Sequence, residues 1–202
     1  NLNWDFDRSQ PYIYKVYKKT SIEDNFQSIS NINIDKGSKV KVLNLYPYNP
    51  DGTGHVQTSV VESYTTWDGE EITLPTSASL KKWMEMPNEE HPKGYGQGII
   101  EVTPVKLLDF NENPQGYLYD ENGEYIYDSI MIGSWDSNAS NVISNLGGNE
   151  LLKFVEYGRG LLLGHDTITS SFGLGSTFYK TFSNKLGILN NSSPTVGRNK
   201  VY

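Results

Sequence analysis

Three polar stretches of the chain each follow an apolar run that is typical of a strand, and their side chains could bind a ligand or activate water. The stretches begin after Tyr46, after Gly133 and after Leu163. In an open parallel sheet, ligands bind outside the carboxyl ends of the strands, where the strand order reverses. We therefore expect the three stretches to form one ligand site. Its predicted residues are Tyr48, Asn49, Trp135, Asp136, Asn138, His165 and Thr167.

His165 is the predicted site residue best suited to catalysis, because an imidazole ordinarily titrates near neutral pH and can serve as a general base. Asp136 or Asp166 could orient the imidazole, and the pair would then activate a water molecule for hydrolysis. A structural interpretation stands beside this one. Residues 164–167 could form a turn in which Asp166 makes an Asx turn or caps a helix while His165 bonds to the backbone. Trp135 also fits two roles, stacking on a sugar or packing in the core.

The chain contains no cysteine, and this absence excludes several kinds of chemistry. Disulfides, thiolate zinc sites and a thiol nucleophile are all impossible. No Gly-x-Ser-x-Gly sequence is present either, so the usual signal of a serine hydrolase is missing. We predict no resident metal and no cofactor. Only the hydrolytic alternative would draw on a divalent ion, held by acidic side chains.

Composition and charge argue against two broad classes of partner. The chain has 202 residues, a formal net charge of −7 and a pI of about 5.0, and most of its acidic residues fall within residues 42–150. An acidic surface repels polyanions, so we expect no nucleic-acid binding. Mean hydropathy is −0.53, and no apolar run approaches the ~20 residues of a membrane-spanning helix, so we expect no membrane insertion.

The apolar pattern predicts strands that alternate with helices. Residues 11–18 alternate as an edge strand does. Further strands are predicted over residues 40–46, 99–105, 127–136 and 161–163, the last two as buried strands. Strands joined by helical crossovers imply an α/β fold, with a mostly parallel sheet flanked by helices and right-handed connections.

Three helices are predicted between and after these strands. The first begins at Ser77 or Ser79. The second is capped by Asn149 and ends at Gly158 in the left-handed conformation, and the third begins at Ser176. The residues expected on the inner faces are Leu80, Trp83 and Met84 in the first helix, Leu151, Leu152 and Val155 in the second, and Phe178, Phe182 and Leu186 in the third.

The change of pattern near residue 37 predicts two parts of unequal size. Residues 1–36 are predicted to form an N-terminal β arm, made of the edge strand and a linker. Residues 37–202 are predicted to form one α/β domain. The last residues read like the beginning of another strand, which favours a domain truncated at its C-terminus.

Two motifs in the α/β region resemble those of a known family. The first is Tyr127-Asp128-x-Ile130-x-x-Gly133-x-Trp135-Asp136-x-Asn138, and the second is Glu156-x-Gly158-Arg159-Gly160-x-Leu162-x-Gly164-His165-Asp166-Thr167. In this order they resemble a family of uncharacterised domains in large exported Gram-positive proteins. That family is similar to the class I glutamine amidotransferase-like superfamily, which has a flavodoxin-like sheet and includes the ThuA-like proteins. The resemblance covers roughly residues 39–190.

The resemblance implies an amidotransferase-like or flavodoxin-like fold in a secreted or cell-surface bacterial protein. Active amidotransferases of the superfamily place a cysteine after a central strand, where this chain has Leu163-Gly164-His165-Asp166. Because the chain has no cysteine, glutamine amidotransferase activity is excluded.

The sequence therefore favours a non-catalytic accessory or ligand-binding domain of a larger protein. Its partner at the sheet crevice would be a small polar or carbohydrate-like ligand or another protein, alongside the other domains of the longer chain. The alternative is a hydrolase that uses His165 with Asp136 or Asp166. A structural spacer, with the crevice filled by Trp135 and tyrosines, is a third interpretation.

Overall fold

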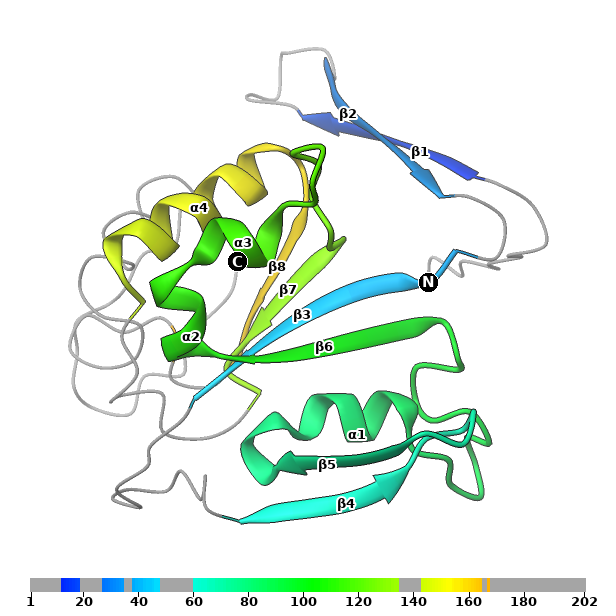
Figure 1. Cartoon of the computed structure of the whole chain (residues 1–202). Helices are drawn as coiled ribbons and strands as arrows, with labels where there is room; N and C mark the ends of the chain where they lie inside the picture. The colour runs from blue at the N-terminus through cyan, green and yellow to red at the C-terminus, as the bar shows by residue number, and fades with distance from the viewer. Residues whose placement is uncertain are drawn as a thin grey trace, which may run out of the picture. The chain divides into compact units, whose positions relative to one another are not determined.

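Four parallel strands in the order β6-β3-β7-β8 form the sheet that positions the predicted site (Figure 1). The strands are β3 (Val40–Tyr46), β6 (Ile100–Lys106), β7 (Ser129–Ile132) and β8 (Gly160–Leu163). Leu45 of β3 pairs with Val105 on one side and with Ile132 on the other, and Ile132 pairs with Leu163. The predicted α/β class, with a mostly parallel sheet flanked by helices, is confirmed.

The computed structural model describes residues 12–18, 27–34, 38–47, 60–134, 143–164 and 167. The chain divides into two compact units, Asn1–Lys39 and Val40–Tyr202. The first unit contains an antiparallel hairpin of β1 (Tyr12–Lys18) and β2 (Gln27–Ile34), with an irregular register between Val16 and Tyr17. The sequence predicts β1 but not β2, because Ser and Asn alternate with Ile there and make the segment look like a polar connection.

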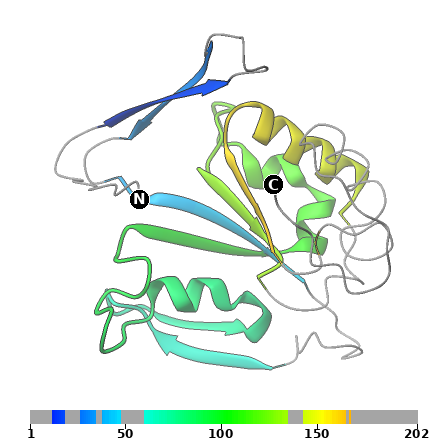
Figure 2. The ribbon, with the colours of Figure 1, turned by 180° about the vertical axis from the view of Figure 1, so that it is seen from behind.

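The hydrophobic core lies between the sheet and helices α2 (Leu107–Glu112), α3 (Pro114–Leu118) and α4 (Asn145–Glu156). These helices lie next to one another beside β7 and β8 when the molecule is seen from the front and from behind (Figure 1, Figure 2). Alternate residues of a strand share a face, so Leu43 and Leu45 of β3 point toward the same core. The other fully buried members are Leu107, Phe110, Leu118, Ile130, Ile132, Ile143, Leu151 and Phe154. Each such side chain contributes roughly 1.5–3 kcal/mol through burial.

The connection from β3 to β6 carries a hairpin and a short helix. The hairpin consists of β4 (Val61–Thr65) and β5 (Glu71–Pro75), and a 3-10 turn, η1 (Thr76–Ala78), leads into α1 (Ser79–Glu85). Glu85 Oε1 accepts a hydrogen bond from the Val102 backbone N–H at 3.0 Å, and Lys81 Nζ donates to the Val102 carbonyl at 3.2 Å. Because Val102 is near the start of β6, these bonds place the end of α1 toward the amino edge of the sheet. The start of α1 therefore lies toward the carboxyl edge, and the preceding turn η1 contacts β3.

The predicted inner face of α1 is wrong at Trp83, whose side chain is 48% exposed. Lys81 and Glu85 are four residues apart and share the face toward β6, so Trp83 lies on the opposite side of the helix. The predicted cap is wrong as well, because neither Ser77 nor Ser79 makes a capping hydrogen bond through its side chain.

Helix α4 begins earlier than the sequence predicts. Ser144 is the N-cap instead of Asn149, and its hydroxyl accepts a hydrogen bond from the Gly147 N–H at 2.9 Å. Gly147 and Gly148 are poor helix formers, so the sequence of the first turn does not indicate a helix. The end of the helix is as predicted, because Gly158 has a φ of 102°.

Strand β8 is not buried on both faces, because its central residue Leu162 is 59% exposed. Leu161 and Leu163 pack against the core, and Leu162 points to the other face of this outer strand of the described sheet. Neither the β4–β5 hairpin nor helices α2 and α3 are predicted from the sequence, which reads there as irregular connections. The predicted helix from Ser176 lies outside the described residues.

Candidate functional site

The carboxyl ends of β3, β7 and β8 lie side by side and form what is called here the carboxyl edge. Its described residues include Pro47, Gly133, Ser134 and Gly164, with which the three polar stretches begin. From β3 the chain leads to β6 on one side, whereas from β7 it leads to β8 on the other. The strand order therefore reverses between β3 and β7, and such a point is where an open parallel sheet binds its ligands.

A buried polar bridge connects the two strands at this reversal point. The Asn44 side chain of β3 is fully buried, and its Nδ2 donates to Ser134 Oγ at 3.0 Å and to the Met131 carbonyl at 3.3 Å. Asn44 points away from the core that contains Leu43 and Leu45, because neighbouring strand residues face opposite ways. The bridge fixes Ser134, the first side chain after the β7 turn, against β3.

The turns that follow β7 and β8 are in direct contact. Gly133 has a φ of 87°, and a Cβ atom there would lie 2.5 Å from Thr167 Cγ2. A Cβ atom on Gly164 would collide with the carbonyl oxygen of Gly133. Both positions therefore require glycine, by conformation at Gly133 and by close approach at Gly164. The second and third polar stretches consequently start from one tightly packed junction.

Thr167 is the predicted site residue that the structure describes. It is buried, and its hydroxyl donates a 2.8 Å hydrogen bond to the carbonyl of Gly164. This bond fits the interpretation of residues 164–167 as a structural turn. The other predicted site residues lie outside the described residues: Tyr48, Asn49, Trp135, Asp136, Asn138, His165 and Asp166.

Two buried hydroxyl groups near the start of α1 have no hydrogen-bond partner in the described part of the chain. They are Ser77 Oγ and Ser79 Oγ, on residues that are 0% and 6% exposed. Buried polar groups are nearly always paired with protein, water or ligand, so such hydroxyls indicate a place where a bound polar molecule could complete the bonding. Their segment contacts β3, which also carries Asn44.

The opposite, amino edge of the sheet is held by an ion pair. Arg159 Nη1 lies 2.7 Å from Asp128 Oδ1, and the other carboxylate oxygen accepts a hydrogen bond from the Lys41 backbone N–H at 2.9 Å. Asp128 therefore connects the amino ends of β3, β7 and β8. These motif residues have a structural role that is separate from the carboxyl edge.

The most perturbed carboxylate of the α-helical layer is Glu150 of α4, which is 1% exposed. It accepts hydrogen bonds from Lys153 Nζ at 2.7 Å, Tyr119 OH at 3.0 Å and Gln115 Nε2 at 3.1 Å. Burial would raise the pKa of Glu150, but these bonds outweigh burial and hold the pKa below its ordinary value. Burial, with hydrogen bonds to Tyr125 and Glu150, raises the pKa of Tyr119. Each of these three side chains donates a hydrogen bond to Glu150, so the cluster ties α3 and Tyr119 to α4.

Sequence reasoning overlooked Asn44, Ser77 and Ser79 as site residues. An asparagine between two leucines of a buried strand was the available signal for Asn44, because a polar side chain in such a strand needs a specific partner. The two serines were interpreted only as helix caps. Nothing in the local sequence indicates that their hydroxyls are buried without partners.

Comparison of the chain with protein-family models, with curated proteins and with solved structures finds no match. Within the described ranges, no group of three or more His, Asp or Glu side chains could hold a metal ion. Across the same ranges, every helix is too short or too polar to cross a membrane.

Proposed function

We propose that the α/β unit is a ligand-binding domain that takes a small polar or carbohydrate-like molecule at the carboxyl edge between β3 and β7. The observation that carries this proposal is the Asn44–Ser134 bridge, which places a buried amide and a half-buried hydroxyl at the reversal of the strand order. The unpartnered hydroxyls of Ser77 and Ser79 support it, because a polyhydroxylated ligand could bond to them.

We further propose that the fold is flavodoxin-like and related to the amidotransferase-like superfamily. Numbered by their order along the chain, the strands of the sheet run 2-1-3-4, as in the first part of a flavodoxin-like sheet. The lack of cysteine accords with a member that does not hydrolyse glutamine. By the motif resemblance, the domain would be an accessory part of a larger secreted or cell-surface bacterial protein, with residues 1–36 as a β arm.

Binding can be measured by isothermal titration calorimetry of the whole chain against cell-wall muropeptides and against cello-, chito- and manno-oligosaccharides. We expect saturable binding that is weakened at least about tenfold, near 1.4 kcal/mol, by Asp136→Ala or Trp135→Ala. Asp128→Asn, at the amino edge, is the matched control and should bind like the unmodified chain. Equal affinity for all these variants, or no saturable binding to any ligand, would refute the proposal.

The same samples distinguish a hydrolase from a binding domain. Chromatography of the oligosaccharides and muropeptides after incubation would reveal cleavage products. Turnover that His165→Ala abolishes would replace the binding proposal with the hydrolytic alternative, in which His165 and an aspartate activate water.

A further inference from the structure

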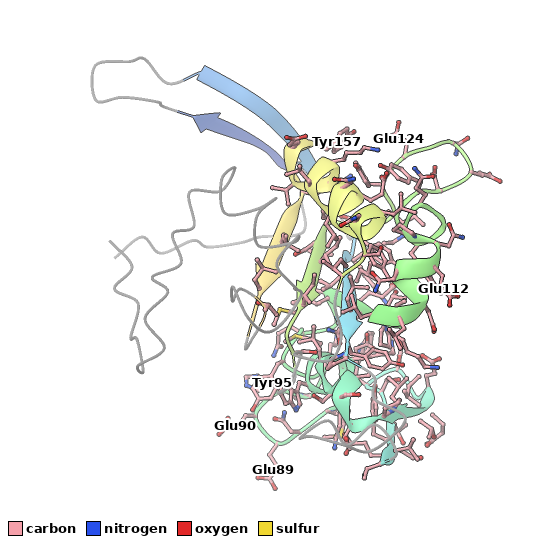
Figure 3. All side chains as sticks on the ribbon, turned by 90° about the vertical axis from the view of Figure 1, so that its left-hand side faces the viewer. Glu89, Glu90, Tyr95, Glu112, Glu124 and Tyr157 are labelled. Atoms are coloured by element: carbon pink, nitrogen blue, oxygen red, sulfur yellow. The ribbon has the colours of Figure 1, made fainter. Side chains whose placement is uncertain are left out.

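The face of the four-stranded sheet that points away from the hydrophobic core, called here the outer face, is only partly covered by the described elements. Asn44, Met131 and Leu162 pair across β3, β7 and β8, so their side chains form one row on this face. Asn44 is fully buried, Met131 is half-buried and Leu162 is 59% exposed. The helical layer, in which Figure 3 labels Glu112 of α2, lies against the opposite face. Cover on the outer face therefore decreases from β3 toward β8.

On β8, the outer face presents one leucine between two glycines. Gly160 and Gly164 lie two residues before and after Leu162 and share its face. A Cβ atom on Gly164 would lie 3.1 Å from Met131 Cε, and a Cβ atom on Gly160 would lie 3.0 Å from Ser129 Oγ. The side chains of β7 therefore fill the space beside the glycines, and Leu162 projects from this surface.

An apolar outer face on a parallel sheet requires a cover. Parallel sheets occur almost only where both faces are covered, because the crossover connections place helices on them. Helices α2, α3 and α4 cover the core face, and η1 contacts β3. The described elements leave Leu162 exposed. The outer face of β7 and β8 therefore needs a further apolar element.

Residues 176–186 of the same chain have the pattern that such an element requires. Phe178, Phe182 and Leu186 recur every four residues, which predicts a helix with one apolar side. Lys180 falls on the opposite side of that helix. A helix of this length spans about 16 Å, close to the roughly 13 Å of a four-residue strand such as β7 or β8. The predicted helix therefore fits the uncovered surface in both polarity and length.

Chain connectivity allows this segment to reach the outer face. Thr167 lies next to Gly133 at the carboxyl end of the β7–β8 pair. The linker of residues 168–175 can extend up to about 26 Å from there, and a tethered segment has a high effective concentration at a surface within its reach. Residues 168–202 also carry four basic and no acidic side chains, so the rest of this chain of net charge −7 attracts them.

We infer that residues 176–186 form an amphipathic helix that docks on the outer face of β7 and β8. Its apolar side, centred on Phe182, covers Leu162 and Met131, while Lys180 faces solvent. This contact completes the second layer of the sheet. It does not depend on the ligand proposed for the carboxyl edge, and ligand binding is not used to test it.

Because the chain has no native cysteine, pairs of introduced cysteines can test the contact by cross-linking with a short bis-maleimide. We expect Leu162→Cys with Phe182→Cys to cross-link within one chain. Leu162→Cys with Lys180→Cys is the matched control and should give at most about a tenth of the product, because Lys180 lies on the far side of the helix. Leu146→Cys, at a half-exposed residue of α4, should give equally little product with Phe182→Cys. Electrophoresis and peptide mass spectrometry identify the products.

The rate at which a maleimide labels Leu162→Cys in the full chain provides a second measurement. Phe178→Asp and Phe182→Asp together should make this labelling about tenfold faster, because buried carboxylates are costly and the helix would leave the surface. Labelling of Leu146→Cys, on α4, should not change. The cross-linking pairs introduce no charge, so they decide the question if the aspartates unfold the chain.

Three results would overturn the inference. Cross-links from Leu162→Cys that join two chains would assign the outer face to a second copy of the protein. Equal cross-linking from Lys180→Cys and Phe182→Cys would show that no fixed side of the segment meets β8. An unchanged labelling rate of Leu162→Cys in the folded double aspartate variant would show that the segment does not cover the face.

Discussion

Two polar residues in the interior of the α/β unit, Asn44 and Glu150, are each stabilised by several hydrogen bonds. Asn44 is fully buried and bridges β3 to Ser134, and Glu150 is nearly buried and accepts three side-chain hydrogen bonds. An unpaired buried polar group costs about 1–3 kcal/mol, so each partner matters. In the described part of the chain, Ser77 Oγ and Ser79 Oγ have no such partner, and neither have Tyr64 OH and Arg159 Nε; the two serines lie near the start of α1, and we propose them as ligand contacts.

Glu150 should make the free energy of unfolding of the α/β unit decrease at low pH. Its pKa is lowered in the folded state, so its contribution is present above the unfolded value of about 4.3 and is lost as the pH falls through the folded pKa. Glu150→Gln should lower the free energy of unfolding by about 1–3 kcal/mol at pH 7 and flatten its decline below pH 5. Urea denaturation at several pH values measures both effects.

Glu112, an exposed carboxylate of α2 that Figure 3 labels, provides the control for that experiment. Glu112→Gln should leave both the stability at pH 7 and its acid dependence nearly unchanged. If Glu150→Gln behaved in the same way, the hydrogen bonds around Glu150 would contribute nothing measurable.

Between neighbouring elements, residues 128–133 and 159–164 hold β7 and β8 together at both ends. Asp128 and Gly133 are separated by the same number of residues as Arg159 and Gly164, and the two strands pair in the corresponding register. The ion pair therefore closes the amino end of the strand pair, and the glycine contact closes the carboxyl end. Sequence spacing here reflects strand register, because a shift of one residue would break both contacts.

Helix α1 protects the outer edge of β6. The outward backbone N–H and carbonyl of Val102 are bonded by Glu85 and Lys81, so side chains occupy the positions of a missing strand. Glu85→Ala should lower the free energy of unfolding by about 1–3 kcal/mol and promote self-association, because an open strand edge pairs with other chains. Urea denaturation and light scattering at several protein concentrations measure these changes.

Glu89→Ala is the reference variant for Glu85→Ala, because Glu89 is exposed and lies four residues further along the chain, after the end of α1. It should remain monodisperse and as stable as the unmodified protein. A Glu85→Ala protein that matched it in both measurements would show that the edge needs no protection from α1.

At the scale of the whole molecule, the buried core found among the residues whose burial is described lies in the second compact unit. Its residues lie between Leu43 and Phe154, and the four-stranded sheet lies between Val40 and Leu163. The first unit contributes a two-stranded hairpin, and such hairpins are marginally stable alone. The division at Lys39 therefore separates the β1–β2 hairpin from the four-stranded sheet and its core.

Removal of residues 1–39 should leave the second unit folded. We expect the shortened chain to keep its far-ultraviolet circular dichroism per residue and a cooperative thermal transition within a few degrees of the full chain, since the sheet and core are retained. Scanning calorimetry of the two proteins provides the comparison. Loss of the cooperative transition would mean that the first unit contributes to the core.

Predictions from the sequence were most successful where the apolar residues of a single segment are regularly spaced. The predicted strands at 40–46 and 99–105, which the structure has at Val40–Tyr46 and Ile100–Lys106, and the glycine stop at Gly158 all follow from local patterns. The predictions failed where tertiary contacts overrode the pattern, as at Trp83, which faces solvent because Lys81 and Glu85 of the same helix bond to β6. Most predicted ligand residues lie outside the described ranges, so they stay predictions.

By itself, the sequence determined that parallel strands alternate with helices, that three polar stretches start at one edge of the sheet, and that no thiol chemistry is possible. Only the tertiary structure decided that Asn44 meets Ser134, that Gly133 touches Gly164, and that two serine hydroxyls are buried without partners. The reason is physical. Periodicity records which face of an element is buried, whereas contacts between distant residues depend on strand order and register, which the packing of the entire core selects.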